Sequence, residues 1–231
     1  MSITRKAAFT DVQIGDCQES IVVEIRGDES ESEVIILGAH LDSVNTEDMN
    51  TNVIAPGIDD NASGVSVLTE VLRSIVINEY YPKKTIRIIA FGAEEIGLRG
   101  SRKLAKEQEL NKQEHVVAMV NFDMVGYKGK GKDMYISTYY SNMNLAQFLR
   151  LLLNYYQPSV THDFTPGGMS DHVSWHAYGF PAVQAADDFN PNYHSSKDNY
   201  ADGKVMSNYA KLALAFLAEV AKGDIKVDGE T

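Results

Sequence analysis

Hydrophobic and polar positions along the chain follow two spacings, one typical of strands and one typical of helices. Short continuous aliphatic runs, such as the one in "EVIILGAHLDS", predict strands that are buried on both faces. The stretch "ESIVVEIRG" alternates apolar with polar residues and predicts a further strand. On these patterns we expect strands at residues 19–27, 33–43, 83–92, 114–126, 134–138 and 179–185.

In other segments the apolar residues recur at helical spacing, which places them on one face of a helix. Val65, Leu68 and Val71 show this spacing in the segment that follows "DDNASG". Gly223 lies where a glycine is expected just past the end of a closing helix. On these patterns we expect helices at residues 59–78, 100–110, 142–156 and 204–222.

Strands and helices therefore alternate along the chain, and this order is typical of α/β proteins. We expect a mostly parallel, mixed central β-sheet with helices on both faces. The stretch "YKGKGKD" is a turn between elements and is too short to separate domains. The sequence therefore predicts a single domain over residues 1–231.

The composition is that of an ordinary globular protein, with 44% hydrophobic and 23% charged residues. The formal net charge of −11 disfavours nucleic acid and anionic membrane surfaces as partners. The longest apolar runs are too short to span a bilayer. Cys17 is the only cysteine, so no disulfide can form within the chain, and we interpret it as a small apolar residue. The first ten residues lack the apolar core of a signal peptide.

Acidic residues and histidines follow the predicted strands at the positions where ligands bind in α/β sheets, outside the carboxyl ends. Five successive units of the chain each contribute such residues, namely His40 with Asp42, Asp59 with Asp60, Glu94 with Glu95, Asp123, and His194. Each pair has an ordinary explanation by itself, such as a helix cap or a solvated loop. Together, so many carboxylates at one edge would repel each other and raise each other's pKa values.

A bound cation would relieve this repulsion. Imidazole and carboxylate groups are the ligands that zinc prefers when thiolates are absent. One tetrahedral zinc cannot use so many protein ligands, whereas two metals about 3.5–4 Å apart that share one carboxylate can. The residues therefore predict a centre with two metals.

Six motifs carry a resemblance to a known family. They are "GAHLDS", "APGIDDNASG", "FGAEEIGLRGS", "NFDMVGY", "MSDHVSWHAYGFPA" and "NPNYHSSKD". In this order they resemble the bacterial leucyl aminopeptidases, zinc-dependent exopeptidases with two co-catalytic metals. The resemblance extends from about Ser20 to the closing helix, and it implies the zinc-exopeptidase form of the phosphorylase/hydrolase-like architecture.

The resemblance implies five metal ligands for two zinc ions. His40 and Asp123 correspond to ligands of one zinc, and Glu95 and His194 correspond to ligands of the other. Asp60 corresponds to the ligand that bridges both ions.

Three neighbouring acids receive other roles from the resemblance. Glu94 corresponds to the general base, and Asp42 corresponds to an acid that orients the imidazole of His40. Asp59 is the alternative bridging residue if the register shifts by one.

The implied function is a metallo-aminopeptidase that removes an apolar, leucine-like residue from peptides with a free N-terminus. An apolar pocket near the metals would hold the first side chain. The resemblance also implies a secreted or periplasmic location, and we expect a monomer. We keep three alternatives open: a single-zinc glutaminyl cyclase, another exopeptidase on the same fold, and a non-catalytic binding domain. An acidic globular domain without metal is the simplest competing interpretation.

The segment around "TPGGMSDHVSWH" departs from the family, because it lacks the cysteines and the tyrosine that many members carry there. Gly167 and Gly168 suggest a loop near the substrate pocket. His172 and His176 share a helix face, but a metal role is disfavoured because the acid of a His-Glu-x-x-His motif is missing.

Five other residues of interest receive ordinary interpretations. Asp171 follows Ser170 in a helix N-cap region, and Trp175 is expected in the core. We expect His115 and His162 at the surface.

Overall fold

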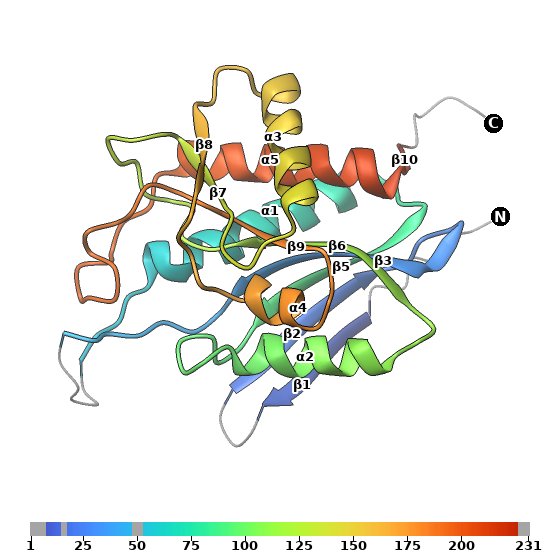
Figure 1. The fold of residues 1–231 in the computed structure, drawn as a ribbon, viewed down its shortest axis with the longest axis horizontal. Helices are drawn as coiled ribbons and strands as arrows, with labels where there is room; N and C mark the ends of the chain where they lie inside the picture. Colours follow the sequence, from blue (N-terminus) through green and yellow to red (C-terminus); the bar gives the residue numbers. More distant parts are fainter. Residues whose placement is uncertain (1–7, 15–17, 48–52, 226–231) are drawn as a thin grey trace.

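The computed structural model describes residues 8–14, 18–47 and 53–225, and its main feature is an eight-stranded sheet (Figure 1). The strand order across the sheet is β1-β2-β5-β3-β6-β9-β7-β8. The strands are β1 (Ala8–Ile14), β2 (Gln18–Ile25), β3 (Ser30–His40), β5 (Lys84–Phe91), β6 (His115–Phe122), β7 (Met134–Ser137), β8 (His162–Thr165) and β9 (Ala182–Ala186). A separate short pair joins β4 (Tyr80–Tyr81) to β10 (Asp224–Ile225).

Four of the seven pairings in this sheet are parallel, and they include the three central ones, β5 with β3, β3 with β6, and β6 with β9. The pairings of β1 with β2, β2 with β5, and β7 with β9 are antiparallel. The predicted mixed, mostly parallel α/β architecture is therefore confirmed. Because β5, β3, β6 and β9 run in the same direction, their carboxyl ends all lie at one edge.

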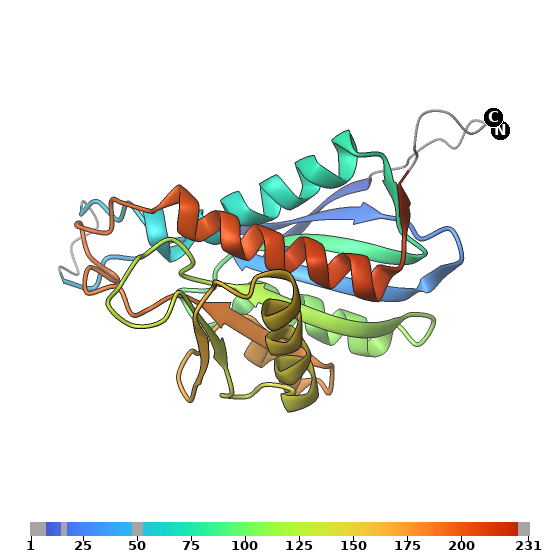
Figure 2. The same cartoon turned by 90° about the horizontal axis from the view of Figure 1, so that it is seen from above.

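Helices cover both faces of the sheet, as Figures 1 and 2 show. The helices are α1 (Gly64–Ile77), α2 (Arg99–Leu110), α3 (Met143–Tyr156), α4 (His172–Ala177) and α5 (Gly203–Ala221). One apolar core contains residues of α1, α3 and α5, and a second contains residues of α2 and α4. No helix in the described ranges is long and apolar enough to cross a membrane.

Strand β3 contributes side chains to both cores, because successive side chains of a strand point to opposite faces of the sheet. Ile35 and Leu37 belong to the core under α1 and α5, whereas Val34 and Ile36 belong to the core under α2 and α4. All four side chains are fully buried. This explains why the strand appears in the sequence as a continuous aliphatic run. Trp175 is 1% exposed and lies in the second core, so its expected core position is confirmed.

The structure differs from the predictions mainly at short elements. The sequence did not predict the strands β4, β8 and β10, because they have only two to four residues and depend on a neighbouring strand for pairing. It also did not predict the longer strand β1, which pairs with β2. The helix predicted from residue 59 begins instead at Gly64, after an irregular π-helical turn (Ile58–Ser63, η1).

At the end of α5, Lys222 adopts the left-handed conformation expected of Gly223 (φ 49°). Gly223 has a different reason to be glycine, because a Cβ there would lie 2.4 Å from the ring of Tyr80. Cys17 lies outside the described residues.

Gly64 offers a test of how tightly α1 packs on the sheet. A Cβ at this position would lie 2.5 Å from the carbonyl oxygen of Phe122, which is the residue before Asp123. Alanine favours a helix over glycine by roughly 1 kcal/mol, but a backbone carbonyl cannot move aside as a side chain can. We therefore expect Gly64→Ala to lower the free energy of unfolding by about 1–3 kcal/mol, measured by urea denaturation. Gly203→Ala, whose Cβ would meet nothing within 4 Å, serves as the control. An unchanged midpoint for Gly64→Ala would contradict this packing.

Candidate metal centre

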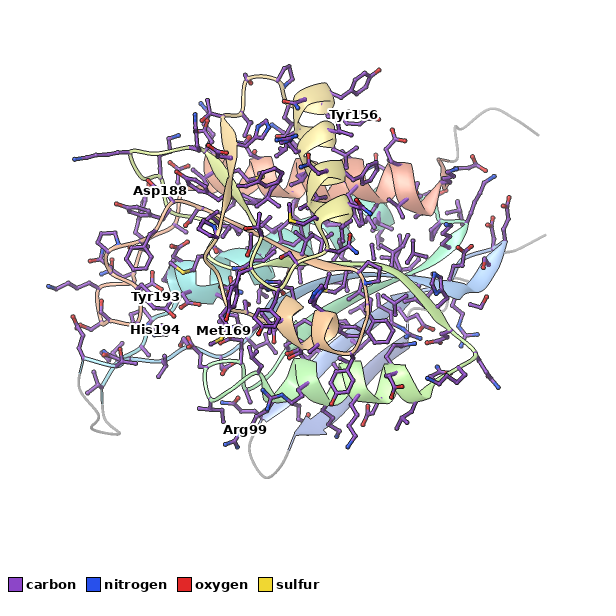
Figure 3. All side chains as sticks on the ribbon, viewed as in Figure 1. Arg99, Tyr156, Met169, Asp188, Tyr193 and His194 are labelled. Atoms are coloured by element: carbon purple, nitrogen blue, oxygen red, sulfur yellow. The ribbon has the colours of Figure 1, made fainter. Side chains whose placement is uncertain are left out.

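The structure brings the acids and histidines singled out in the sequence to the carboxyl edge of the parallel strands. His40 is the last residue of β3, and Asp123 directly follows β6. Glu94 and Glu95 lie in the turn between β5 and α2, and Asp60 lies in the turn η1. His194 comes from the long segment between β9 and α5 (Figure 3).

Two groups of three side chains meet at Asp60. The Nε2 atom of His40 is 3.1 Å from Oδ1 of Asp60 and 3.2 Å from Oδ1 of Asp123. The Nε2 atom of His194 is 3.2 Å from Oδ2 of Asp60 and 2.9 Å from Oε2 of Glu95. The two oxygens of Asp60 therefore serve two different imidazoles, each of which has a second carboxylate.

Asp59, the alternative bridging residue, contacts other groups. Its Oδ1 accepts a hydrogen bond from the Gly126 amide at 2.8 Å, and its Oδ2 accepts one from the Asn190 side chain at 2.9 Å. Burial, the largest cause, raises the pKa of Asp59 to about 6. The geometry therefore places Asp60, and not Asp59, between the two histidines.

The electrostatics of the centre show how strongly its charges interact. Burial, reinforced by neighbouring carboxylates such as Asp123, raises the pKa of Glu94 to about 9. Burial also disfavours the charge on Asp60, but hydrogen bonds with His194 and His40 lower its pKa to about 2. Burial lowers the pKa of His194, whereas hydrogen bonds to Asp60 and Glu95 outweigh it and raise the value to about 9.

A metal cation would stabilise these clustered acids and histidines better than their contacts with one another do. Three sets of ligand atoms lie within 4.8 Å of one another, formed by His40 with Asp60 and Asp123, by Asp60 with Glu95 and His194, and by His40 with Glu94 and Glu95. The Oε1 atom of Glu95 is buried without a hydrogen-bond partner. A buried carboxylate oxygen without a donor is costly unless a cation binds it. Nitrogen and carboxylate oxygen together form a donor set that zinc accepts.

Asp42 lies beside His40 but contacts it differently from the expectation. The Nδ1 atom of His40 is 3.0 Å from the backbone carbonyl of Asp42, whereas the nearest carboxylate oxygen of Asp42 is 3.9 Å away. The carboxylate instead accepts hydrogen bonds from the amides of Glu94 and Glu95, each at 3.0 Å. Asp42 thus fixes the glutamate pair with its side chain and the imidazole with its main chain.

Asp198 has the same relationship to the aspartate pair, and the sequence analysis did not single it out. Its carboxylate accepts hydrogen bonds from the amides of Asp59 at 3.1 Å and Asp60 at 3.0 Å. Asp198 is only 2% exposed. It follows His194 by four residues in "HSSKD", but nothing in that spacing shows that it contacts a turn more than a hundred positions earlier.

The backbone turns sharply where several of these side chains enter the centre. Ala93, Met124 and His194 have φ values of 59°, 54° and 54°, a region that residues other than glycine rarely adopt. Ala93 directly precedes Glu94, and Met124 directly follows Asp123. Such strained positions concentrate at functional sites, where the surrounding structure holds them in place.

A tyrosine that the sequence analysis did not consider packs on His194. The rings of Tyr193 and His194 are stacked with centroids 3.5 Å apart and an interplanar angle of 23°. Burial, aided by the charges of Asp60 and Glu95, raises the pKa of the Tyr193 phenol. The ring of Tyr193 therefore fixes the plane of an imidazole that points at the centre.

The remaining histidines lie outside the candidate centre. His172 is fully buried, and its Nε2 is 3.0 Å from the carbonyl of Tyr139; burial lowers its pKa to about 4. His176 packs edge-on against Tyr140. The expected surface position of His115 is confirmed, whereas His162 is partly exposed and its Nδ1 lies 3.0 Å from the carbonyl oxygen of Val160.

The loop around α4 places an acid close to the centre. Asp171 is the N-cap residue of α4, but its side chain makes no capping hydrogen bond and both of its oxygens are buried without partners. Burial, and the nearby acids Asp123 and Asp42, raise its pKa to about 7. Gly167 and Gly168 of the preceding loop line a cavity next to Asp123.

Comparison with known proteins agrees with this geometry. The model of peptidase family M28 matches residues 20–217. The chain belongs to this family. A probable leucine aminopeptidase of Trichophyton verrucosum is 36% identical over 213 residues, which are 87% of this chain and 57% of the relative. Leucine aminopeptidase 1 of Trichophyton rubrum is 34% identical and covers 89% of this chain and 58% of the relative. The chain thus spans little more than half the length of these relatives.

Solved structures show the same M28 architecture. The LapA aminopeptidase of Legionella pneumophila superimposes with a TM-score of 0.83 at 30% identity, over 95% of this chain and 59% of that one. A zinc aminopeptidase of Bacillus subtilis superimposes with a TM-score of 0.74 at 26% identity, over 92% of this chain and 51% of that one. The glutaminyl cyclase of Porphyromonas gingivalis superimposes with a TM-score of 0.74 at 20% identity, over 93% of this chain and 83% of that one. This similarity shows the fold alone. The chain is therefore a member of a zinc peptidase family.

The position of Asp60 depends on the Asp198 carboxylate, and this can be tested. Asp198→Ala leaves the buried amides of Asp59 and Asp60 without their acceptor, which costs about 1–3 kcal/mol for each buried group. We expect a lower free energy of unfolding and a loss of zinc affinity, measured by urea denaturation and zinc titration. Asp28→Ala, at an exposed position before β3, is the control. Unchanged zinc affinity in Asp198→Ala would contradict the role of Asp198.

Proposed function

We propose that this M28 chain is an aminopeptidase whose centre holds two zinc ions. The supporting observation is the arrangement of Asp60, whose two oxygens lie 3.1 Å and 3.2 Å from two different imidazoles. One ion would bind His40 and Asp123, and the other would bind Glu95 and His194. Asp60 would bridge the two ions.

Charge balance supports two ions over one. The centre contains four carboxylates, on Asp60, Glu94, Glu95 and Asp123, and two imidazoles that are neutral when they bind metal. Buried charges are stable only when they are compensated. One divalent ion would leave about two negative charges uncompensated, whereas two divalent ions would neutralise all four. This favours the aminopeptidase over the single-zinc cyclase.

Glu94 is the proposed general base. Among the described residues it is the carboxylate of the centre that makes no ion pair with an imidazole, although its ligand atoms lie within 4.8 Å of those of His40 and Glu95. Burial raises its pKa to about 9 in the metal-free centre, and two bound cations would lower that pKa, so that Glu94 would be an ionised carboxylate able to accept a proton. Zinc, when bound, supplies a Lewis acid that polarises a carbonyl group and lowers the pKa of a water molecule.

The chain's own residues then complete the reaction. Glu94 accepts a proton from the attacking water and delivers it to the amine that leaves. Asp42, through the amides of Glu94 and Glu95, keeps the base in a fixed position relative to its neighbour. The names of the relatives indicate a free N-terminal residue as the substrate.

The proposed activity is tested with leucine p-nitroanilide and its N-acetylated form, using zinc-loaded protein. An aminopeptidase is expected to hydrolyse the free-amine substrate and to leave the acetylated one intact. Cleavage of both would exclude an exopeptidase that requires a free amine. Cleavage of neither substrate, together with one zinc per chain, would favour the cyclase instead.

The adjacent glutamates give a matched pair of variants. Glu94→Gln removes only the proposed base, so we expect both zinc ions to remain and turnover to fall by about 10²–10⁴-fold. Glu95→Gln removes a proposed ligand, so we expect zinc affinity to fall as well. Metal analysis and steady-state kinetics distinguish the two. Near-normal turnover in Glu94→Gln would show that another residue is the base.

A further inference from the structure

A cavity of about 410 Å³ opens beside Asp123, at the edge of the candidate centre. Apolar side chains of Met124, Phe189 and the ring of Tyr135 form part of its lining. Polar groups form the rest, including Gln184 of β9 and Asp188 of the following loop. The cavity therefore combines a mainly apolar wall with a few polar groups that can orient a ligand.

Gln184 carries an amide whose hydrogen bonding is incomplete. The side chain is 4% exposed, and its Oε1 atom is buried without a hydrogen-bond partner. Gly168, on the wall of the same cavity, leaves room for this oxygen, because a Cβ there would lie 2.6 Å from it. A buried acceptor without a donor is costly, so this position favours a ligand that donates hydrogen bonds.

Asp188 places a carboxylate on the same cavity. One oxygen accepts a hydrogen bond from the Gly131 amide at 2.8 Å, and the structure shows no ion pair between Asp188 and any described lysine, arginine or histidine. The loop that contacts Asp188 contains Lys128, but this lysine pairs with Asp133. Figure 3 shows Asp188 at the same end of the molecule as His194.

A second acid lines the cavity beside Asp188. Asp187 also lines it, and burial together with the charge of Asp59 raises the pKa of Asp187 to about 10. Asp187 is therefore neutral near pH 7, and the carboxylate of Asp188 is the group that remains for a cationic ligand. No lysine, arginine or histidine is among the described residues that line this cavity.

We propose that this cavity binds the side chain of a basic first residue, lysine or arginine, in the substrate. The proposal rests on the aminopeptidase function proposed above. The aliphatic stem of such a side chain packs on Met124, Tyr135 and Phe189, and its cationic head meets Asp188 and the Gln184 oxygen. A leucine side chain would bury the same amide without providing a donor. Asp188 and Gln184 are thus the residues that determine specificity.

The test compares kcat/KM for the p-nitroanilides of arginine, lysine and leucine on zinc-loaded protein. We expect the basic substrates to exceed leucine by at least roughly 10-fold, because a charge-assisted hydrogen bond has about this effect. A preference for leucine in the wild-type protein would overturn the proposal. Failure to cleave any of the three would instead count against the aminopeptidase function itself.

Two variants assign the preference to the cavity. Asp188→Asn keeps an oxygen for the Gly131 amide but removes the charge, so we expect the arginine-to-leucine ratio of kcat/KM to fall by roughly 10-fold to 100-fold. Gln184→Met removes the amide at similar volume and should lower the same ratio. Asp28→Asn makes the same change of charge at an exposed position before β3 and should leave the ratio unchanged. An unaltered ratio in both cavity variants would overturn the assignment.

Discussion

The candidate centre depends on two carboxylates that lie behind it. Asp42 accepts hydrogen bonds from the backbone amides of Glu94 and Glu95. Asp198 accepts them in the same way from the amides of Asp59 and Asp60. These bonds fix the turns that carry Glu94, Glu95 and Asp60 without help from the acidic side chains themselves. The acids are therefore held close together despite their mutual repulsion, which is the condition for binding a divalent cation tightly.

The central sheet fixes where these turns lie relative to one another. Because β5, β3 and β6 are parallel neighbours, the residues that follow them meet at one edge in a fixed register. Asn61 ties the aspartate turn to this edge, since its side chain donates to the Phe122 carbonyl and accepts from the Met124 amide. The packing of the apolar cores thus determines distances within the centre, and a small shift of one strand would separate the candidate ligands.

The proposed reaction and the proposed choice of substrate depend on largely different residues of this chain. The centre is formed by residues at strand ends and in the turns and loops that follow them, whereas the neighbouring cavity shares Asp123 with it and is otherwise lined by residues such as Gln184 of β9, Asp188 and a glycine-containing loop. Loops and pocket walls change more freely than a sheet edge, because fewer packing contacts constrain them. Membership of a family therefore indicates the reaction more securely than it indicates the first residue of the peptide.

The sequence by itself determined the layered α/β fold, its longer strands and helices, and the set of acids and histidines at the strand ends. Aliphatic runs and helical spacing are local patterns, so β3 and α5 could be predicted without knowing their neighbours. Only the tertiary structure decided that Asp60 lies between the histidines, and that Asp198 holds its turn. It also decided that an unpartnered Gln184 faces the cavity. These are contacts between segments far apart in the chain, and no local pattern of residues specifies them.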